Sequence, residues 1–164
     1  MDSLFEFALL LKAIQRELER QMNDAMRPLG LTAAQADALS VIGQAGPLSL
    51  KELGELLIAE AGHPSRLVDR LVEADLVARR AGGDDRRRVE LSLTAQGRRL
   101  EKRIDATRQR FLNLAREVLG DRDLEPALRL LRDLLQYTSF AELVARRREL
   151  LEAGRAGRRS KSLP

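Results

Sequence analysis

The sequence predicts a mainly α-helical fold that carries one small β-hairpin, and three observations support this fold class. Of the 164 residues, 44% are hydrophobic but only 3% are aromatic, a composition typical of packed helices with a core of Leu, Val and Ala. Apolar residues recur at steps of three and four over most of the chain, the period of an amphipathic helix. Between residues 76 and 93 this period changes to the alternation of β-strands.

The N-terminal half predicts four helices. The first spans residues 4 to 26, where apolar residues form one stripe, and Pro28 and Gly30 end it. Two short helices are expected at 33–44 and 50–58, because each is preceded by a capping box; the two boxes are Thr32 with Gln35 and Ser49 with Glu52. The fourth helix begins at Pro64, which is tolerated in a first turn, and ends near Glu73.

A two-stranded hairpin follows these helices. Its first strand is expected from Leu76 to Arg80, and the turn contains the letters AGGDD. In the second strand Val89, Leu91 and Leu93 alternate with polar residues, which predicts one buried face. An isolated hairpin is marginally stable, so we expect it to pack on the preceding helices.

Two longer helices are predicted in the C-terminal half. Thr94 caps a helix that stops at Gly120, and another runs from about Asp123 to about Leu151. At 1.5 Å per residue the helix over 94–119 would be about 39 Å long, and it would project beyond a small core. We therefore expect the apolar stripes of regions 1–31 and 94–151 to be shared between two chains as a helical dimerisation region. A monomeric bundle is the alternative.

Positive charge is concentrated in two segments. The net charge is +4; residues 77–103 contain nine basic and four acidic residues, and residues 145–164 contain seven and two. The last segment, 152–164, is expected to be a basic flexible tail, and a solvated end is favoured over a dedicated role in binding polyanions.

Several classes of function are disfavoured by composition. The chain has no Cys and one His, so we expect no disulfide, no metal site and no cofactor. No nucleophile and base stand at a recognisable spacing, which predicts a protein that is not an enzyme. No apolar run is long enough for a membrane span, and the N-terminus MDSLFEF lacks the basic start of a signal peptide, so the protein is expected to be cytoplasmic.

Residues 32–93 fit a winged helix-turn-helix lobe, in which two short helices precede a hairpin and the second helix enters the DNA major groove. That recognition helix is PSRLVDRLVEA, whose Leu67, Val68 and Leu71 are expected to face inward. The candidates for DNA contact on its exposed side are His63, Ser65, Arg66, Asp69 and Arg70. His63 has an alternative interpretation as a helix-cap residue.

The chain from about residue 5 to 145 resembles the MarR family of bacterial transcriptional regulators. The resemblance is strongest in DDRRRVELSLTAQG, which is similar to the wing and following helix start of that family through Asp85, Arg87, Leu93, Thr94 and Gly97. The stretch SRLVDRLVEADLVARR is similar to its recognition helix and first wing strand. One departure is Asp75, where the family usually has Gly; Asp tolerates a left-handed backbone better than most residues.

The resemblance implies a homodimer whose recognition helices enter major grooves and whose wing residue Arg87, oriented by Asp85, enters the minor groove. Arg86 and Arg88 are then expected to meet phosphates or water. Such a dimer is expected to bind a pseudo-palindromic double-stranded operator with half-sites about 10 base pairs apart, as a repressor. Many members release DNA when small aromatic or phenolic molecules bind, and the sequence leaves open whether this chain has such a pocket. The alternative function is a winged-helix module that binds a protein and not DNA.

Overall fold

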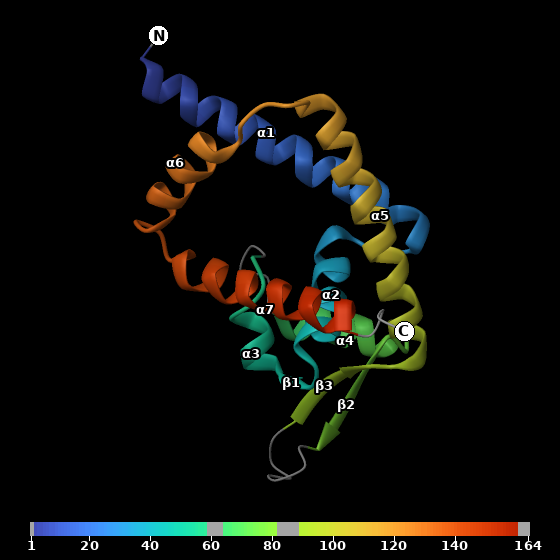
Figure 1. Cartoon of the computed structure of the whole chain (residues 1–164). Coiled ribbons are helices and arrows are strands. Elements are labelled where there is room, and N and C mark those ends of the chain that lie inside the picture. Colours follow the sequence, from blue (N-terminus) through green and yellow to red (C-terminus); the bar gives the residue numbers. More distant parts are fainter. Residues whose placement is uncertain (1, 59–63, 82–88, 161–164) are drawn as a thin grey trace.

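The computed structural model describes residues 2–58, 64–81 and 89–160 and confirms a mainly helical fold with a small antiparallel sheet (Figure 1). The first helix and the lobe that follows it contain α1 (Ser3–Met26), the short 3-10 helix η1 (Arg27–Leu29), α2 (Ala33–Ala45), β1 (Leu48–Ser49), α3 (Leu50–Gly54), α4 (Pro64–Glu73), β2 (Val77–Ala81) and β3 (Val89–Leu93). Three further helices complete the described chain: α5 (Ala95–Leu119), α6 (Glu125–Leu135) and α7 (Ala141–Ser160).

The sheet has three strands in the order β1-β3-β2, so the prediction of a two-stranded hairpin was incomplete. β1 is only two residues long and pairs with β3 at Leu48 and Leu91, a contact between distant segments that no local pattern indicates. Leu91 and Leu93 are buried as predicted. Val89 is 51% exposed because it is the first residue of β3, at the end of the strand away from the core. Backbone pairing with β1 thus supports the hairpin from a second side.

The hydrophobic core lies in the lobe formed by α2, α3, α4 and the sheet, and the first half of α5 closes it. Both predicted capping boxes are present at the starts of α2 and α3. The largest completely buried side chains come from six different elements and meet in one cluster; they are Met26, Leu39, Ile42, Leu53, Leu71, Leu91 and Ile104.

The end of α3 and the continuity of the predicted last helix were wrong. α3 stops at Gly54 instead of 58, because the amide of Leu56 bonds the carbonyl of Leu53 and tightens the final turn. The single helix expected from about 123 to 151 is divided into α6 and α7. Between them the Thr138 hydroxyl donates to the Leu135 carbonyl and accepts from the amide of Phe140, a local arrangement that competes with helix.

The last helix also runs further than predicted. α7 continues to Ser160, so the segment expected to form a flexible tail from 152 onward begins inside a helix. Its Ala, Glu, Leu and Arg residues are strong helix formers, and they outweigh the cost of the two glycines at 154 and 157.

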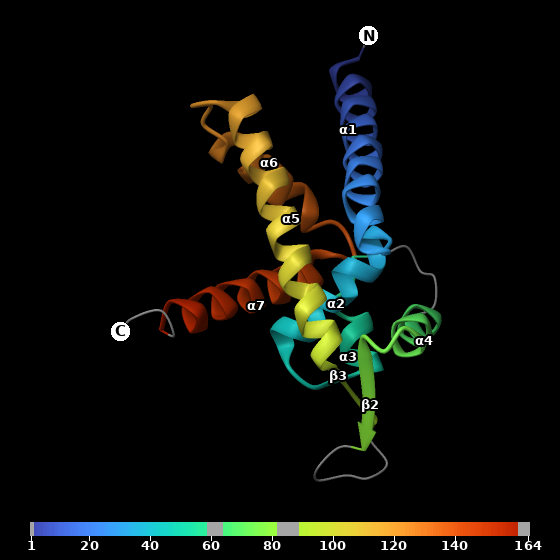
Figure 2. The same cartoon turned by 90° about the vertical axis from the view of Figure 1, so that its right-hand side faces the viewer.

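Long helices extend away from the core (Figures 1 and 2). They expose apolar side chains. In α1 only Met26 is buried. The exposed large apolar residues of α1, α5 and α6 are Leu4, Phe5, Leu9, Leu10, Leu11, Ile14, Leu18, Leu112, Leu114, Val118, Leu128, Leu130, Leu131 and Leu134. No helix among the described residues is long and apolar enough to cross a membrane.

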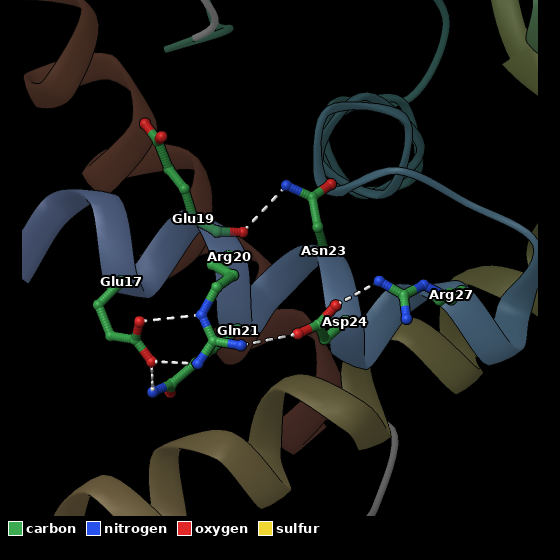
Figure 3. A network of polar contacts seen from close by, with 7 residues as sticks. All are labelled: Glu17, Glu19, Arg20, Gln21, Asn23, Asp24 and Arg27. Carbon is green, nitrogen blue, oxygen red and sulfur yellow. Dashed lines mark hydrogen bonds and ion pairs between the residues drawn. The ribbon is translucent and has the colours of Figure 1, made fainter.

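A polar network fixes the C-terminal half of α1 (Figure 3). Arg20 donates to both carboxylate oxygens of Glu17 and to Asp24. The bond from Arg20, aided by one from Gln21, lowers the pKa of Glu17 to about 2. Asn23 connects α1 to the lobe, because its side-chain oxygen accepts from the amide of Ala33 at 2.9 Å, at the start of α2.

Candidate nucleic-acid interface

The helix α4 has one buried and one exposed side. Val68 and Leu71 are completely buried, and Leu67 is half-buried against the core, as predicted. Arg66 and Arg70 are exposed and lie one turn apart, so both guanidinium groups lie on one side of the helix. Neither forms an ion pair with another described residue. The donors of a guanidinium group match acceptors on a ligand such as guanine O6 and N7.

Asp69 binds the first wing strand. Its Oδ1 accepts from Arg79 Nη2 at 2.6 Å, and the two side chains are 49% and 40% exposed. Asp69 was predicted as a DNA-contacting residue, and its half-exposed carboxylate also accepts a hydrogen bond from an arginine of β2. Arg79 was not among the predicted residues; its position opposite the buried Leu91 places it on the side of the sheet that meets α4.

The end of α4 is joined to the start of α5 by a compact set of bonds. Asp75 has a φ of 54°, the left-handed conformation expected for this position. The Thr94 hydroxyl donates to the Asp75 carbonyl at 2.6 Å and accepts from the amide of Gly97 at 2.9 Å. The amide of Thr94 donates to the Leu76 carbonyl at 3.1 Å. These bonds fix the angle between the recognition helix, the first wing strand and the long helix.

The wing strands and α4 lie at the end of the molecule opposite the N-terminus of α1 (Figure 2). β2 also carries the exposed Arg80, whose backbone pairs with Glu90 of β3. Ser65 is half-buried in the first turn of α4. Five predicted contact residues lie outside the described residues: His63, Asp85, Arg86, Arg87 and Arg88.

The described residues contain no group of three His, Asp or Glu side chains placed to hold a metal ion. The guanidinium groups at this end of the molecule can supply hydrogen bonds and charge attraction. A helix and a two-stranded ribbon that present cations side by side are the two kinds of element that fit the grooves of DNA.

The arrangement defines a winged helix-turn-helix, and comparison with known proteins gives the family. A model of the MarR family matches residues 31–89. The organic hydroperoxide resistance transcriptional regulator of Bacillus subtilis is 31% identical over 101 residues, which cover 61% of this chain and 69% of that protein. The transcriptional repressor MdtR of the same species is 30% identical over 92 residues, 56% of this chain and 59% of the relative. The chain belongs to the MarR family.

Solved structures agree with this assignment. The reduced form of MarR from Escherichia coli superposes with a TM-score of 0.65 at 27% identity, covering 78% of this chain and 95% of that one. A mutant of the same protein in complex with operator DNA has a TM-score of 0.67 at 24% identity, covering 82% and 95%, and shows the shared fold.

Proposed function

We propose that this protein is a sequence-specific regulator of transcription that binds double-stranded DNA as a homodimer and acts as a repressor. The observation that carries the proposal is the geometry of α4, which is fixed by the buried Val68 and Leu71 and presents Arg66 and Arg70 on its open side. One relative is named a transcriptional repressor, and a structural neighbour was solved with operator DNA.

In the proposed complex each side chain has a role that its chemistry suits. Arg66, Arg70 and Ser65 contact base edges in the major groove. His63 either contacts a base as well or caps the start of α4. Arg79, oriented by Asp69, approaches the adjacent phosphates. In the wing, Arg87 enters the minor groove beside its partner Asp85, while Arg86 and Arg88 meet the backbone.

Homodimerisation is supported by the apolar side chains that α1, α5 and α6 expose, because a monomer rarely leaves so large an apolar surface in water. In the proposed division, residues 1–31 and 94–151 form the dimer arm, and residues 32–93 form the DNA-binding lobe. Two lobes related by a two-fold axis would bind half-sites about 10 base pairs apart. The proposed place of action is the cytoplasm.

The proposal is tested by selecting bound duplexes from a pool of random DNA with the whole protein. We expect enrichment of a pseudo-palindrome whose half-sites are about one helical turn apart, bound at least about 1,000-fold more tightly than unselected DNA. A pool that shows no enrichment after repeated rounds contradicts the proposal. It would favour the alternative, a winged helix that binds a protein. Titration of the selected complex with small aromatic and phenolic compounds then tests for an effector.

A further inference from the structure

The last helix does not belong only to the dimer arm, because α7 packs against α2 of the DNA-binding lobe (Figure 1). Leu150 contributes to this contact, since it is half-buried against the hydrophobic core. Two consecutive arginines of α7 then bond the region where α3 ends. The sequence assigned these residues to the dimerisation region, and no periodic pattern indicates contacts across 91 or 110 positions of the chain.

Arg147 makes the central contact. Its Nη2 donates to Asp37 Oδ1 at 2.8 Å, and its Nη1 donates to Asp37 Oδ2 at 3.4 Å and to the Leu56 carbonyl at 3.2 Å. The side chain is only 14% exposed. One planar guanidinium therefore joins α7, α2 and the turn that closes α3.

The same carboxylate is shared with α5. Arg108 Nη2 donates to Asp37 Oδ1 at 3.2 Å, and its Nη1 donates to the hydroxyl of the completely buried Ser40 at 2.7 Å. Asp37 thus receives one arginine from the long helix and one from the last helix. Partly buried charges held by several hydrogen bonds fix geometry far more strictly than exposed ion pairs do.

Arg146 adds a more exposed contact at the same place. It donates to Glu142 at 2.6 Å and to Glu55 at 2.9 Å, and Glu55 is the C-cap residue of α3. The hydrogen bond to Glu142, that residue's charge and the bond to Glu55 raise the pKa of Arg146 above its ordinary value. Because Arg146 is nearly half-exposed, we assign the main role to Arg147.

The end of α3 touches the start of the recognition helix. A Cβ placed on Gly54, the last residue of α3, would lie 3.5 Å from Pro64 Cγ, the first residue of α4. The bonds to Leu56 and Glu55 therefore act two residues or fewer from the point where the two helices meet. A displacement of α7 would therefore move the end of α3 and, through the packing of Gly54 on Pro64, the N-terminal turn of α4.

We propose that α7 is a brace for the helix-turn-helix, in which Arg147 is a positioning residue that holds the end of α3 and, through it, the N-terminal turn of α4. Its effect on DNA affinity rests on the proposed function, whereas the bracing itself does not. Arg147 is not placed to contact DNA itself, because its side chain is mostly buried and bonded to Asp37 and Leu56.

The test compares Arg147→Lys and Arg147→Gln with the matched control Arg148→Gln, which removes the neighbouring exposed arginine of the same helix. Lysine keeps the positive charge but lacks the planar guanidinium group, which donates to two acceptors at once. Amide hydrogen exchange of the free protein is measured over 50–56 and 64–73. We expect exchange in both segments to become about tenfold faster in the Arg147 variants and to remain unchanged in the control, because local opening is set by such contacts.

DNA binding supplies the second measurement. For the selected operator we expect Arg147→Lys to weaken affinity roughly 2- to 30-fold. The slope of log affinity against log salt is measured for Arg147→Gln, which removes the charge. It should stay unchanged, since loss of one phosphate contact would reduce it by about 0.9. A reduced slope would assign Arg147 to the DNA contact and overturn the brace.

The exchange result decides the inference without DNA. If a folded Arg147→Gln or Arg147→Lys variant exchanges amide hydrogens in both segments as slowly as the native protein does, the bracing role of Arg147 is overturned. This holds even if DNA binding is intact. If the wild-type protein binds no DNA, the proposed function fails, and faster exchange in the same segments still supports the brace.

Discussion

Gly97 lies against the carbonyl oxygen of Leu76, and a Cβ at position 97 would be 2.0 Å from that oxygen. The two residues meet because Thr94 starts α5 with its amide on the same carbonyl. Position 97 is therefore restricted to glycine by the approach of the helix to Leu76, the residue before the first wing strand. This contact sets how the long helix leaves the DNA-binding lobe.

Replacing Gly97 with Ala should destabilise the fold by about 1 to 3 kcal/mol, because the methyl group forces backbone to move. The measurement is the free energy of unfolding from urea denaturation. Gln96→Ala, an exposed change in the same turn, is the control and should alter that free energy by less than about 0.5 kcal/mol. Equal stability of Gly97→Ala and the native protein would show that α5 does not approach the Leu76 carbonyl this closely.

Asp69 and Arg79 should act as a pair in DNA binding. Because both side chains are partly exposed, their bond should add no more than about 1 kcal/mol to stability. In a double-mutant cycle of Asp69→Asn and Arg79→Gln, the two losses in operator affinity should be non-additive by about 0.5 kcal/mol or more. Additive losses, or a changed base preference in Asp69→Asn, would instead support Asp69 as a base-contacting residue.

Arg87 is predicted to be the minor-groove residue among the three wing arginines. Arg87→Ala should weaken operator binding by about 1 to 3 kcal/mol, because a guanidinium in a narrow groove lies where the potential is most negative. Arg86→Ala and Arg88→Ala should mainly reduce the salt dependence. Fluorescence anisotropy at several salt concentrations separates the three, and equal effects of all three would contradict a special role for Arg87.

The exposed stripe of α1 should mediate dimerisation. Ile14→Glu should shift the protein toward monomer in sedimentation equilibrium at micromolar concentration, since a buried, unpaired carboxylate is costly. Lys12→Glu, on the same helix, is the control and should remain dimeric. A native protein that sediments as a monomer would contradict the dimer outright.

Local chemistry made much of the fold predictable. The hydroxyl and amide of Thr32 and Gln35 define a helix start within four residues. The left-handed backbone of Asp75 followed from the resemblance to the MarR family, which usually has Gly at this position. The strand β1, the bond between Asp69 and Arg79 and the contact between Asp37 and Arg147 join distant segments. Their residues carry no periodic signal, because tertiary packing alone brings them together.

In the proposed complex with DNA, α4 recognises bases through Arg66 and Arg70. The most direct test measures the affinity of Arg66→Ala and Arg70→Ala for the selected operator and for operators with single base-pair changes. Each variant should lose about 1 to 3 kcal/mol on the selected operator and no longer discriminate at one position in each half-site. Discrimination equal to that of the native protein at every position would contradict the claim.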